Sequence, residues 1–157
     1  MPSIHLTTFV NAPIDRVFNL SRNVTLHKKS FEDSGEQAIA GTTSGLIGLN
    51  ETVTWKARHL GRNRMLKIKI SSMTPPDAFI DEMAEGDFRS MKHEHHFKKV
   101  ENGTIMIDLF HFETPYGAVG KVFNRLYLTR YLRRLLEKRN RMIKDYAETS
   151  KWQHLLV

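Results

Sequence analysis

The feature that most constrains this chain is a long stretch of period-two alternation, from residue 36 to residue 113, followed by a helical segment. The clearest alternating segments are residues 51–59, 66–70, 91–97 and 104–113. Turn residues separate them at residues 61–63, 74–77, 85–87 and 101–103. Alternation of this kind is typical of strands with one buried face, and Asn102-Gly103 is a strong hairpin signal. The pattern predicts an antiparallel meander of about five or six strands.

A strand and two short helices are expected before the meander. Residues 3–11 are rich in β-branched and aromatic side chains, which favours a strand. Pro13 suits the first turn of a helix and Asp15 suits the positive end of its dipole, so a short helix is expected over residues 13–20. A second short helix is expected over about residues 23–31. With the first strand added, the curved sheet has about six or seven strands.

The residues after Thr114-Pro115 are expected to be helical, with apolar side chains in two stripes on nearly opposite faces. The first stripe is Val119, Val122, Phe123 and Leu126. The second is Leu128, Leu132, Leu135, Leu136, Ile143 and Tyr146. Because a straight helix cannot bury both stripes on one sheet, we predict a break near residues 126–128, followed by a long helix to about Glu148. The expected fold class is α+β.

The composition fits one domain over residues 1–157, with 40% hydrophobic residues and no cysteine. The lack of cysteine excludes disulfide scaffolds, Cys-based zinc modules and thiol nucleophiles. The longest apolar runs are only a few residues, and residues 1–11 lack the pattern of a secretory signal. We therefore expect no transmembrane helix and a cytoplasmic localisation.

The net charge of +7 is concentrated in one segment. Residues 121–144 hold nine Lys/Arg and one acidic residue, which leaves 15 basic against 16 acidic residues elsewhere. No aromatic stacking platform is interleaved with these arginines, so a nucleic-acid partner is not expected. The basic face of residues 130–144 is interpreted as a solvated surface. A peripheral contact with an anionic membrane surface is the functional alternative.

Strand parity gathers polar side chains on the more apolar face of the sheet. On one strand that face carries Met91, His93, His95 and Phe97. The equivalent sets elsewhere are Glu51, Val53, Trp55 and Ala57, and Thr104, Met106, Asp108, Phe110 and Phe112. The sequence therefore predicts an interior wall that contains Glu51, Trp55, His93, His95 and Asp108.

Arg139 falls at the centre of the second helical stripe, so its side chain is predicted to point at the sheet. An unpaired guanidinium in an apolar interior would cost several kcal/mol. We therefore expect a carboxylate partner. The candidates are Glu51, Asp81, Glu82 and Asp108.

The order of these elements resembles the START-like SRPBCC superfamily, which has the helix-grip fold and includes birch-pollen-allergen-like proteins, polyketide cyclases and coenzyme-Q-binding proteins. The resemblance covers nearly the whole chain and is strongest to a bacterial branch whose function is not established. The motifs that carry it are residues 48–51, 53–55, 59–61, 79–82, 93–95, 103–104 and 114–117, together with Asp108 and Arg139. Met83, Asp87 and Met91 depart from the branch, where Gln, Pro and Trp are common.

The resemblance implies a sheet wrapped around the long helix, with a hydrophobic cavity between them. It also implies that loops and the short helices open this cavity. Residues 41–48 are rich in glycine but lack the Gly-Lys-Ser/Thr ending of a phosphate-binding loop. They are interpreted as a flexible loop at the cavity mouth, with Leu46 and Ile47 as gate residues.

Four interpretations of the interior polar set remain open. It is a satisfied hydrogen-bond network that fixes helix against sheet, or a polar anchor for a hydrophobic ligand. A metal site of His93, His95 and Asp108 lacks a clear further ligand. General acid–base catalysis by His95 or His93 is the fourth.

The predicted function is binding or transport of a small hydrophobic or amphipathic molecule, such as a lipid, quinone or polyketide-like compound. The alternatives are a cyclase- or hydrolase-like enzyme using His93, His95 and Asp108, and a regulatory protein-interaction domain. Neither a cofactor nor a bound metal is expected. The predicted ligand-binding residues are Glu51, Val53, Trp55, Met91, His93, His95, Asp108, Phe110, Phe123, Leu132, Leu136 and Arg139.

Overall fold

The computed structural model describes residues 3–59, 61–114 and 118–156, with the side chains of residues 118–125 outside this description. The N-terminal elements are β1 (Ser3–Val10), α1 (Ile14–Ser21), α2 (Val24–Ser30) and the 3-10 helix η1 (Glu32–Ser34). The central strands are β2 (Gln37–Gly41), β3 (Thr52–His59), β4 (Arg62–Thr74), β5 (Ala78–Glu85), β6 (Ser90–Val100) and β7 (Gly103–Glu113). The C-terminal elements are α3 (Ala118–Glu148), the 3-10 helix η2 (Ser150–Trp152) and α4 (Gln153–Leu156).

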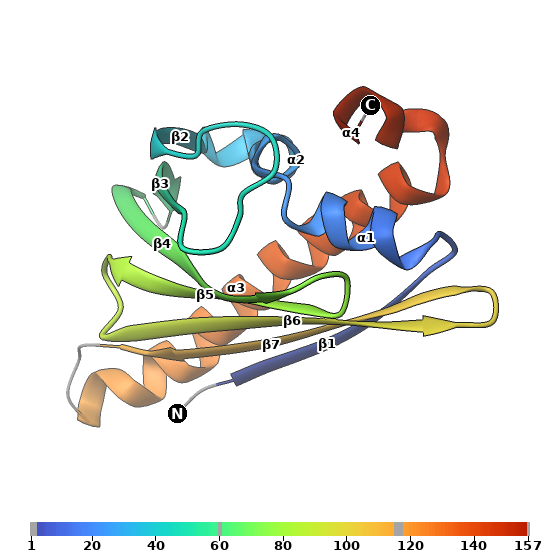
Figure 1. Ribbon diagram of the computed structural model, residues 1–157. Coiled ribbons are helices and arrows are strands. Elements are labelled where there is room, and N and C mark those ends of the chain that lie inside the picture. Colours follow the sequence, from blue (N-terminus) through green and yellow to red (C-terminus); the bar gives the residue numbers. More distant parts are fainter. Residues whose placement is uncertain (1–2, 60, 115–117, 157) are drawn as a thin grey trace.

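Within the described residues, seven strands form one antiparallel sheet in the order β1-β7-β6-β5-β4-β3-β2. The strands β2 to β7 follow one another as a meander, and β1 returns to pair with β7 so that Leu6 lies opposite Asp108. Figure 1 shows this curved sheet with α3 running across one side of it. The predicted α+β helix-grip architecture, with two short helices after the first strand, is confirmed.

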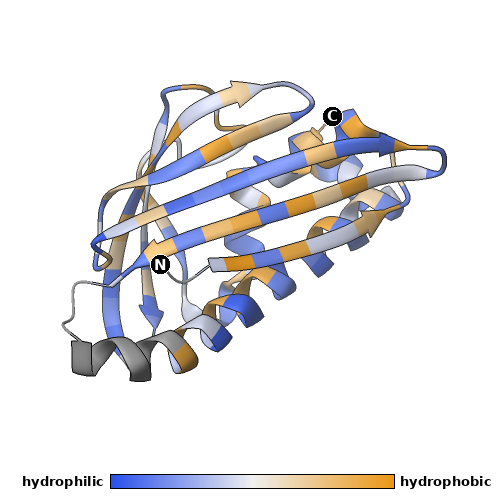
Figure 2. Cartoon of the chain, turned by 90° about the horizontal axis from the view of Figure 1, so that it is seen from below, coloured by the Kyte–Doolittle hydropathy of each residue, from blue (hydrophilic) through white to orange (hydrophobic). Residues whose placement is uncertain are grey.

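The alternation in sequence becomes an alternation in burial. Along β7 every second residue is buried, from Thr104 to Phe112, and the residues between them are half-buried. Figure 2 shows the corresponding bands of hydrophobic and hydrophilic colour along the strands. Because side chains of a strand point alternately to its two faces, the buried set lies on the side that α3 covers.

The helix α3 runs without interruption from Ala118 to Glu148, so the predicted break near residues 126–128 is wrong. The reason is that both apolar stripes need not be buried: the side chain of Leu126 is 61% exposed. The stripe that faces the sheet includes Leu136, Arg139 and Ile143, all buried. No helix in the described part of the chain is both long and apolar enough to cross a membrane.

The short helices lie close to their predicted positions and hold the loop that follows β2. The side chain of Asn23 caps α2 by accepting a hydrogen bond from the backbone N–H of Leu26 at 2.9 Å. The backbone N–H of Val24 donates to the Gly45 carbonyl at 2.8 Å, and that of Ile47 donates to the Arg22 carbonyl at 3.1 Å. The loop is therefore fixed against the junction between α1 and α2.

Candidate functional site

A cavity of about 340 Å³ lies between α3 and the sheet. Its walls are mostly apolar, with side chains from several strands and from the helix. They include Val53, Trp55, Ile68, Ile70, Met91, Phe110, Leu132 and Leu136. This volume is near the lower end of the range of about 300–1,000 Å³ that is typical of small-molecule sites.

Most of the predicted binding residues line this cavity. They are Val53, Trp55, Met91, His93, His95, Phe110, Leu132, Leu136 and Arg139. Asp108 lies directly behind the wall, fully buried and in contact with His93. The side chain of Phe123 lies outside the described residues. The geometry thus brings these nine residues and Asp108 together, while their role in binding stays a prediction.

Glu51 does not belong to the interior wall, and its predicted place there is wrong. Its side chain is exposed and accepts hydrogen bonds from the backbone N–H of Gly48 and from the hydroxyl of Thr42. The strand β3 begins only at Thr52, so the parity that places Val53 inside does not extend back to Glu51. Glu51 instead ties together the ends of the loop after β2.

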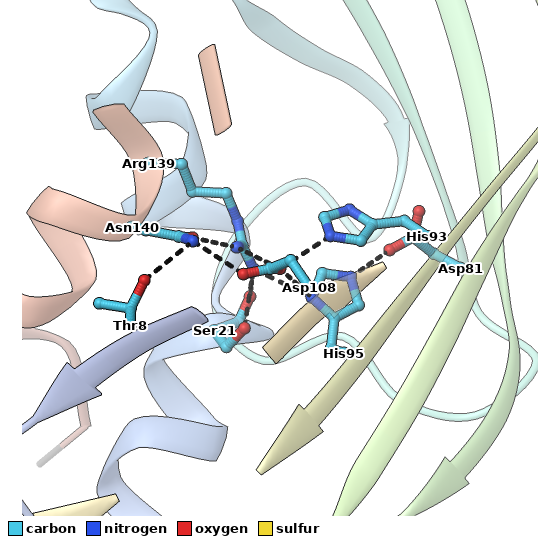
Figure 3. Close-up of polar contacts among 8 residues, drawn as sticks. All are labelled: Thr8, Ser21, Asp81, His93, His95, Asp108, Arg139 and Asn140. Atoms are coloured by element: carbon cyan, nitrogen blue, oxygen red, sulfur yellow. Dashed lines mark hydrogen bonds and ion pairs between the residues drawn. The ribbon is translucent and has the colours of Figure 1, made fainter. Parts of the chain in front are cut away.

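Arg139 is 4% exposed and is held by protein groups on several sides, as Figure 3 shows. Its Nη2 donates to the carbonyl oxygen of Ser21 at 3.1 Å and to the Ser21 hydroxyl at 2.7 Å. Its Nη1 donates to Oδ1 of Asn140 at 2.9 Å and to Oδ1 of Asp108 at 3.4 Å. The predicted burial and carboxylate pairing are confirmed, with Asp108 as the ion-pair partner.

Asp108 joins the helix and the sheet. Its Oδ1 accepts from His93 Nε2 at 2.8 Å, and its Oδ2 accepts from Asn140 Nδ2 at 2.7 Å. Burial alone would raise the pKa of Asp108, but hydrogen bonds from His93 and His95 and the charge of Arg139 hold this pKa well below its usual range. Asp108 is therefore an ionised acceptor, and His93 donates through Nε2.

The two histidines stack with ring centroids 3.7 Å apart. Burial and the neighbouring His95 lower the pKa of His93 to about 4, despite the opposing effect of Asp108. His95 bonds through Nε2 to Oδ2 of Asp81 at 2.7 Å, and its Nδ1 lies 3.4 Å from Arg139 Nη2. We call Ser21, Asp81, His93, His95, Asp108, Arg139 and Asn140 the inner cluster.

Three members of the inner cluster meet the simplest geometric requirement for a metal site. One ligand atom each from Asp81, His93 and His95 lies within 4.8 Å of the others. This set differs from the predicted one, because Asp81 takes the place of Asp108. The guanidinium of Arg139 beside His95 adds a positive charge next to the position that a cation would occupy. Carboxylate and imidazole groups are suitable metal ligands, but the positive charge of Arg139 disfavours a cation at this position.

A second polar group lines the cavity and was missed in the sequence. Glu36 is buried, and its two carboxylate oxygens lie 3.3 Å from His27 Nε2 and 3.4 Å from His59 Nε2. The other ring nitrogen of His59 lies 2.6 Å from the hydroxyl of Tyr131 on α3. We call His27, Glu36, His59 and Tyr131 the outer cluster. His59 has the same strand parity as Val53 and Trp55, which is the signal that would have found it.

The loop after β2 contributes to the cavity through only one of its two predicted gate residues. Ile47 is buried and lines the cavity, whereas Leu46 is exposed and its backbone pairs with Asn23. Of the three residues that depart from the pattern of the branch that the sequence resembles, Asp87 and Met91 line the cavity and Met83 does not.

Comparison with solved structures supports the fold assignment. The Zhui aromatase/cyclase from Streptomyces sp. R1128 superimposes with a TM-score of 0.73 at 14% identity, covering 93% of both chains. The KanY protein gives 0.71 at 20% identity, covering 94% of this chain and 97% of its own. Major latex-like protein 151 from Panax ginseng gives 0.68 at 15% identity, again covering 94% and 97%. No protein-family profile and no curated protein sequence matches the chain.

The structure defines a helix-grip protein with an enclosed polar network beside an apolar cavity. This is the helix-grip fold that the resemblance to the START-like SRPBCC superfamily implied, and the solved structures named above share it. At these identities the similarity establishes the fold, and activity has to be argued from the cavity itself.

Proposed function

We propose that the protein binds or carries a small hydrophobic or amphipathic molecule, such as a lipid, quinone or polyketide-like compound, in the cavity between α3 and the sheet. The observation that carries this proposal is the cavity of about 340 Å³ with apolar walls. One water molecule takes up about 30 Å³ in the liquid, so the space exceeds what a few structural waters fill. Removing an apolar ligand surface from water at these walls would supply the binding free energy.

The inner cluster limits what the polar end of the cavity does. Both terminal nitrogens of Arg139 already donate to Ser21, Asn140 and Asp108, so its planar fork is not free to hold a ligand carboxylate by two bonds. Its main role is to fix helix against sheet. Within the inner cluster, the polar contacts that remain for a ligand belong to His93 and Asp81, which also line the cavity.

The proposal is tested by native mass spectrometry of the protein purified from its own cells. A bound molecule should appear as a discrete added mass that is lost on denaturation. Leu132→Trp, which takes up part of the cavity, should reduce the fraction of protein that carries this mass, whereas Leu126→Trp on the exposed side of the same helix should not. An unliganded wild-type protein that also fails to bind N-phenyl-1-naphthylamine would contradict the proposal.

A cyclase- or hydrolase-like activity is the second candidate, favoured by the position of His93 on the cavity wall and its hydrogen bond to Asp108. The pKa of His93, lowered to about 4, makes it a weak base at neutral pH. His95 is engaged at both ring nitrogens. If the protein converts a bound molecule to a product, and His93→Ala or His95→Ala abolishes this activity, an enzymatic function would be favoured over binding alone.

We also propose that the basic face of α3 brings the protein to anionic membrane surfaces. Arg130, Arg134 and Arg141 are exposed. Lys138, in contrast, is paired with Asp33 at 2.6 Å. Such a contact would place a carrier beside its cargo. Salt-sensitive sedimentation with phosphatidylserine vesicles, reduced by charge reversal of the three arginines, tests this role; equal binding to neutral vesicles would contradict it.

A further inference from the structure

The outer cluster joins three elements to the buried carboxylate of Glu36, which lies just before β2. His27 comes from α2, Glu36 precedes β2, His59 ends β3, and Tyr131 lies on α3. All four side chains line the same cavity as the inner cluster. His27 also packs on Trp55, with ring centroids 4.4 Å apart. The cluster is thus part of the cavity wall and not an isolated surface pair.

Hydrogen bonding fixes which atoms of the outer cluster donate. Burial would raise the pKa of Glu36, but hydrogen bonds from His27 and His59 lower it to about 2, so the carboxylate is an acceptor. His59 then donates through Nε2, and in the neutral ring its Nδ1 accepts a hydrogen bond from the Tyr131 hydroxyl at 2.6 Å. The oxygen of Tyr131 keeps lone pairs that can accept a hydrogen bond from a ligand.

The inner cluster presents acceptors as well. His93 donates to Asp108 through Nε2, which leaves its Nδ1 as a lone-pair acceptor in the neutral ring. Figure 3 draws one dashed line from the His93 ring, and it leads to Asp108. Asp81 uses Oδ2 for His95, and within the described residues its Oδ1 has no hydrogen-bond partner. A ligand hydroxyl matches such acceptors, whereas a carboxylate is repelled by the charge of Asp81.

The two clusters lie at different positions along the cavity. His59 pairs with Arg62 of β4, whereas Asp81 of β5 pairs with Ile70, eight residues farther along β4. On the helix, Tyr131 and Arg139 are eight residues apart, or about 12 Å along the axis. Apolar side chains lie between them, including Ile68 of β4 and Leu136 of α3. The cavity is therefore apolar in the middle and accepts hydrogen bonds at both ends.

We propose that the outer cluster is a second ligand-binding site, acting through the Tyr131 hydroxyl, and that the ligand is an elongated neutral molecule with a hydroxyl group at each end. This inference rests on the proposed binding function and narrows it, because a fatty acid or other single-headed anion would leave one end unmatched. Arg22 and Arg64 also line the cavity, but Arg64 is paired with Asp87 at 2.8 Å and Arg22 donates to Asn19 and to the Ile47 carbonyl.

The test uses estradiol, a rigid diol with its hydroxyls at opposite ends, and its 3-deoxy and 17-deoxy analogues, each competing with N-phenyl-1-naphthylamine. Tyr131→Phe removes the hydroxyl and keeps the ring, and should weaken estradiol binding roughly tenfold, the effect of one hydrogen bond. The analogue that lacks the hydroxyl facing Tyr131 should bind wild type and Tyr131→Phe equally well. The other analogue should still bind Tyr131→Phe more weakly than wild type. Tyr146→Phe, on the same helix but away from the cavity, is the matched control.

Three results would overturn the inference. Equal affinities of estradiol and both analogues for wild type and Tyr131→Phe would refute the second site while leaving cavity binding intact. Binding of myristate in preference to estradiol would refute the neutral diol class. Failure of estradiol, myristate and N-phenyl-1-naphthylamine to bind at all would remove the proposed function together with the inference.

Discussion

Arg139 on α3 and Ser21 at the end of α1 are joined by two hydrogen bonds, to the carbonyl and to the hydroxyl of the same serine, at 3.1 and 2.7 Å. The same guanidinium contacts Asp108 on β7. One side chain therefore connects the long helix, a short helix and the sheet. The inner cluster is first of all a structural junction, and only its remaining atoms are available to the proposed ligand.

Replacing Arg139 should therefore be felt mainly in stability. Arg139→Ala leaves the buried Asp108 without its ion-pair partner and should lower the free energy of unfolding by about 3–5 kcal/mol. Arg139→Lys keeps the charge but cannot reach Ser21, Asn140 and Asp108 at once, so it should recover only part of the loss. Urea denaturation of the three proteins checks this. If Arg139→Ala has normal stability but no longer binds ligand, Arg139 would instead be an anchor for the ligand.

Shortening an apolar wall residue should weaken ligand binding. Leu132 lines the cavity and is half-buried, so Leu132→Ala should reduce the affinity for N-phenyl-1-naphthylamine by about 1.5–3 kcal/mol, through loss of the buried contact. Leu126→Ala, on the exposed side of the same helix, serves as the control. Fluorescence titration measures both. Equal affinities of the two variants would place the probe outside the cavity.

Glu36 should make stability depend on pH in the acid range. Its pKa is lowered from 4.5 in the unfolded chain to about 2 in the folded protein, so between these values the unfolded state binds more protons. The free energy of unfolding therefore falls as the pH drops below about 5. Glu36→Gln should reduce the loss between pH 7 and pH 3 by roughly 2 kcal/mol.

Denaturation curves at both pH values, compared with the exposed Glu32→Gln as control, test this dependence. An acid-induced loss of the same size in wild type and Glu36→Gln would show that the outer cluster does not hold Glu36 ionised.

Metal ions should not stabilise the protein. The carboxylate of Asp81 is already bonded to His95 at 2.7 Å, and Arg139 adds a positive charge beside that ring. We expect the thermal midpoint to stay within about 1 °C when zinc or EDTA is added, because a ligand that does not bind the native state cannot shift it. A rise that depends on zinc concentration and disappears in His93→Ala would establish a metal site.

Much of the fold could be predicted because strand parity and helix periodicity depend on local sequence. Parity placed Trp55, His93 and Phe110 on the cavity wall, and the helical wheel placed Arg139 against the sheet. The same rules failed where the burial of a residue depends on where its strand begins. Glu51 precedes β3 by one residue and lies outside, although its parity matches that of Val53.

The outer cluster could not be predicted for a different reason. Its members lie far apart in the sequence, on three elements and in the segment before β2, so no spacing links them. Only the curvature of the sheet, which brings the end of β3 to α3, makes His59 and Tyr131 neighbours. The predicted helix break failed because the sequence does not show that Leu126 remains exposed.

The central claim, that a small hydrophobic molecule occupies the cavity, is tested most directly with Trp55 as reporter. Trp152→Phe leaves Trp55 as the single tryptophan and keeps a ring beneath Arg16. Titration with N-phenyl-1-naphthylamine should give saturable energy transfer from Trp55 with one-to-one stoichiometry, and Leu132→Phe, which narrows the cavity, should weaken the binding. Transfer that does not saturate, or that is unchanged in Leu132→Phe, would contradict the account.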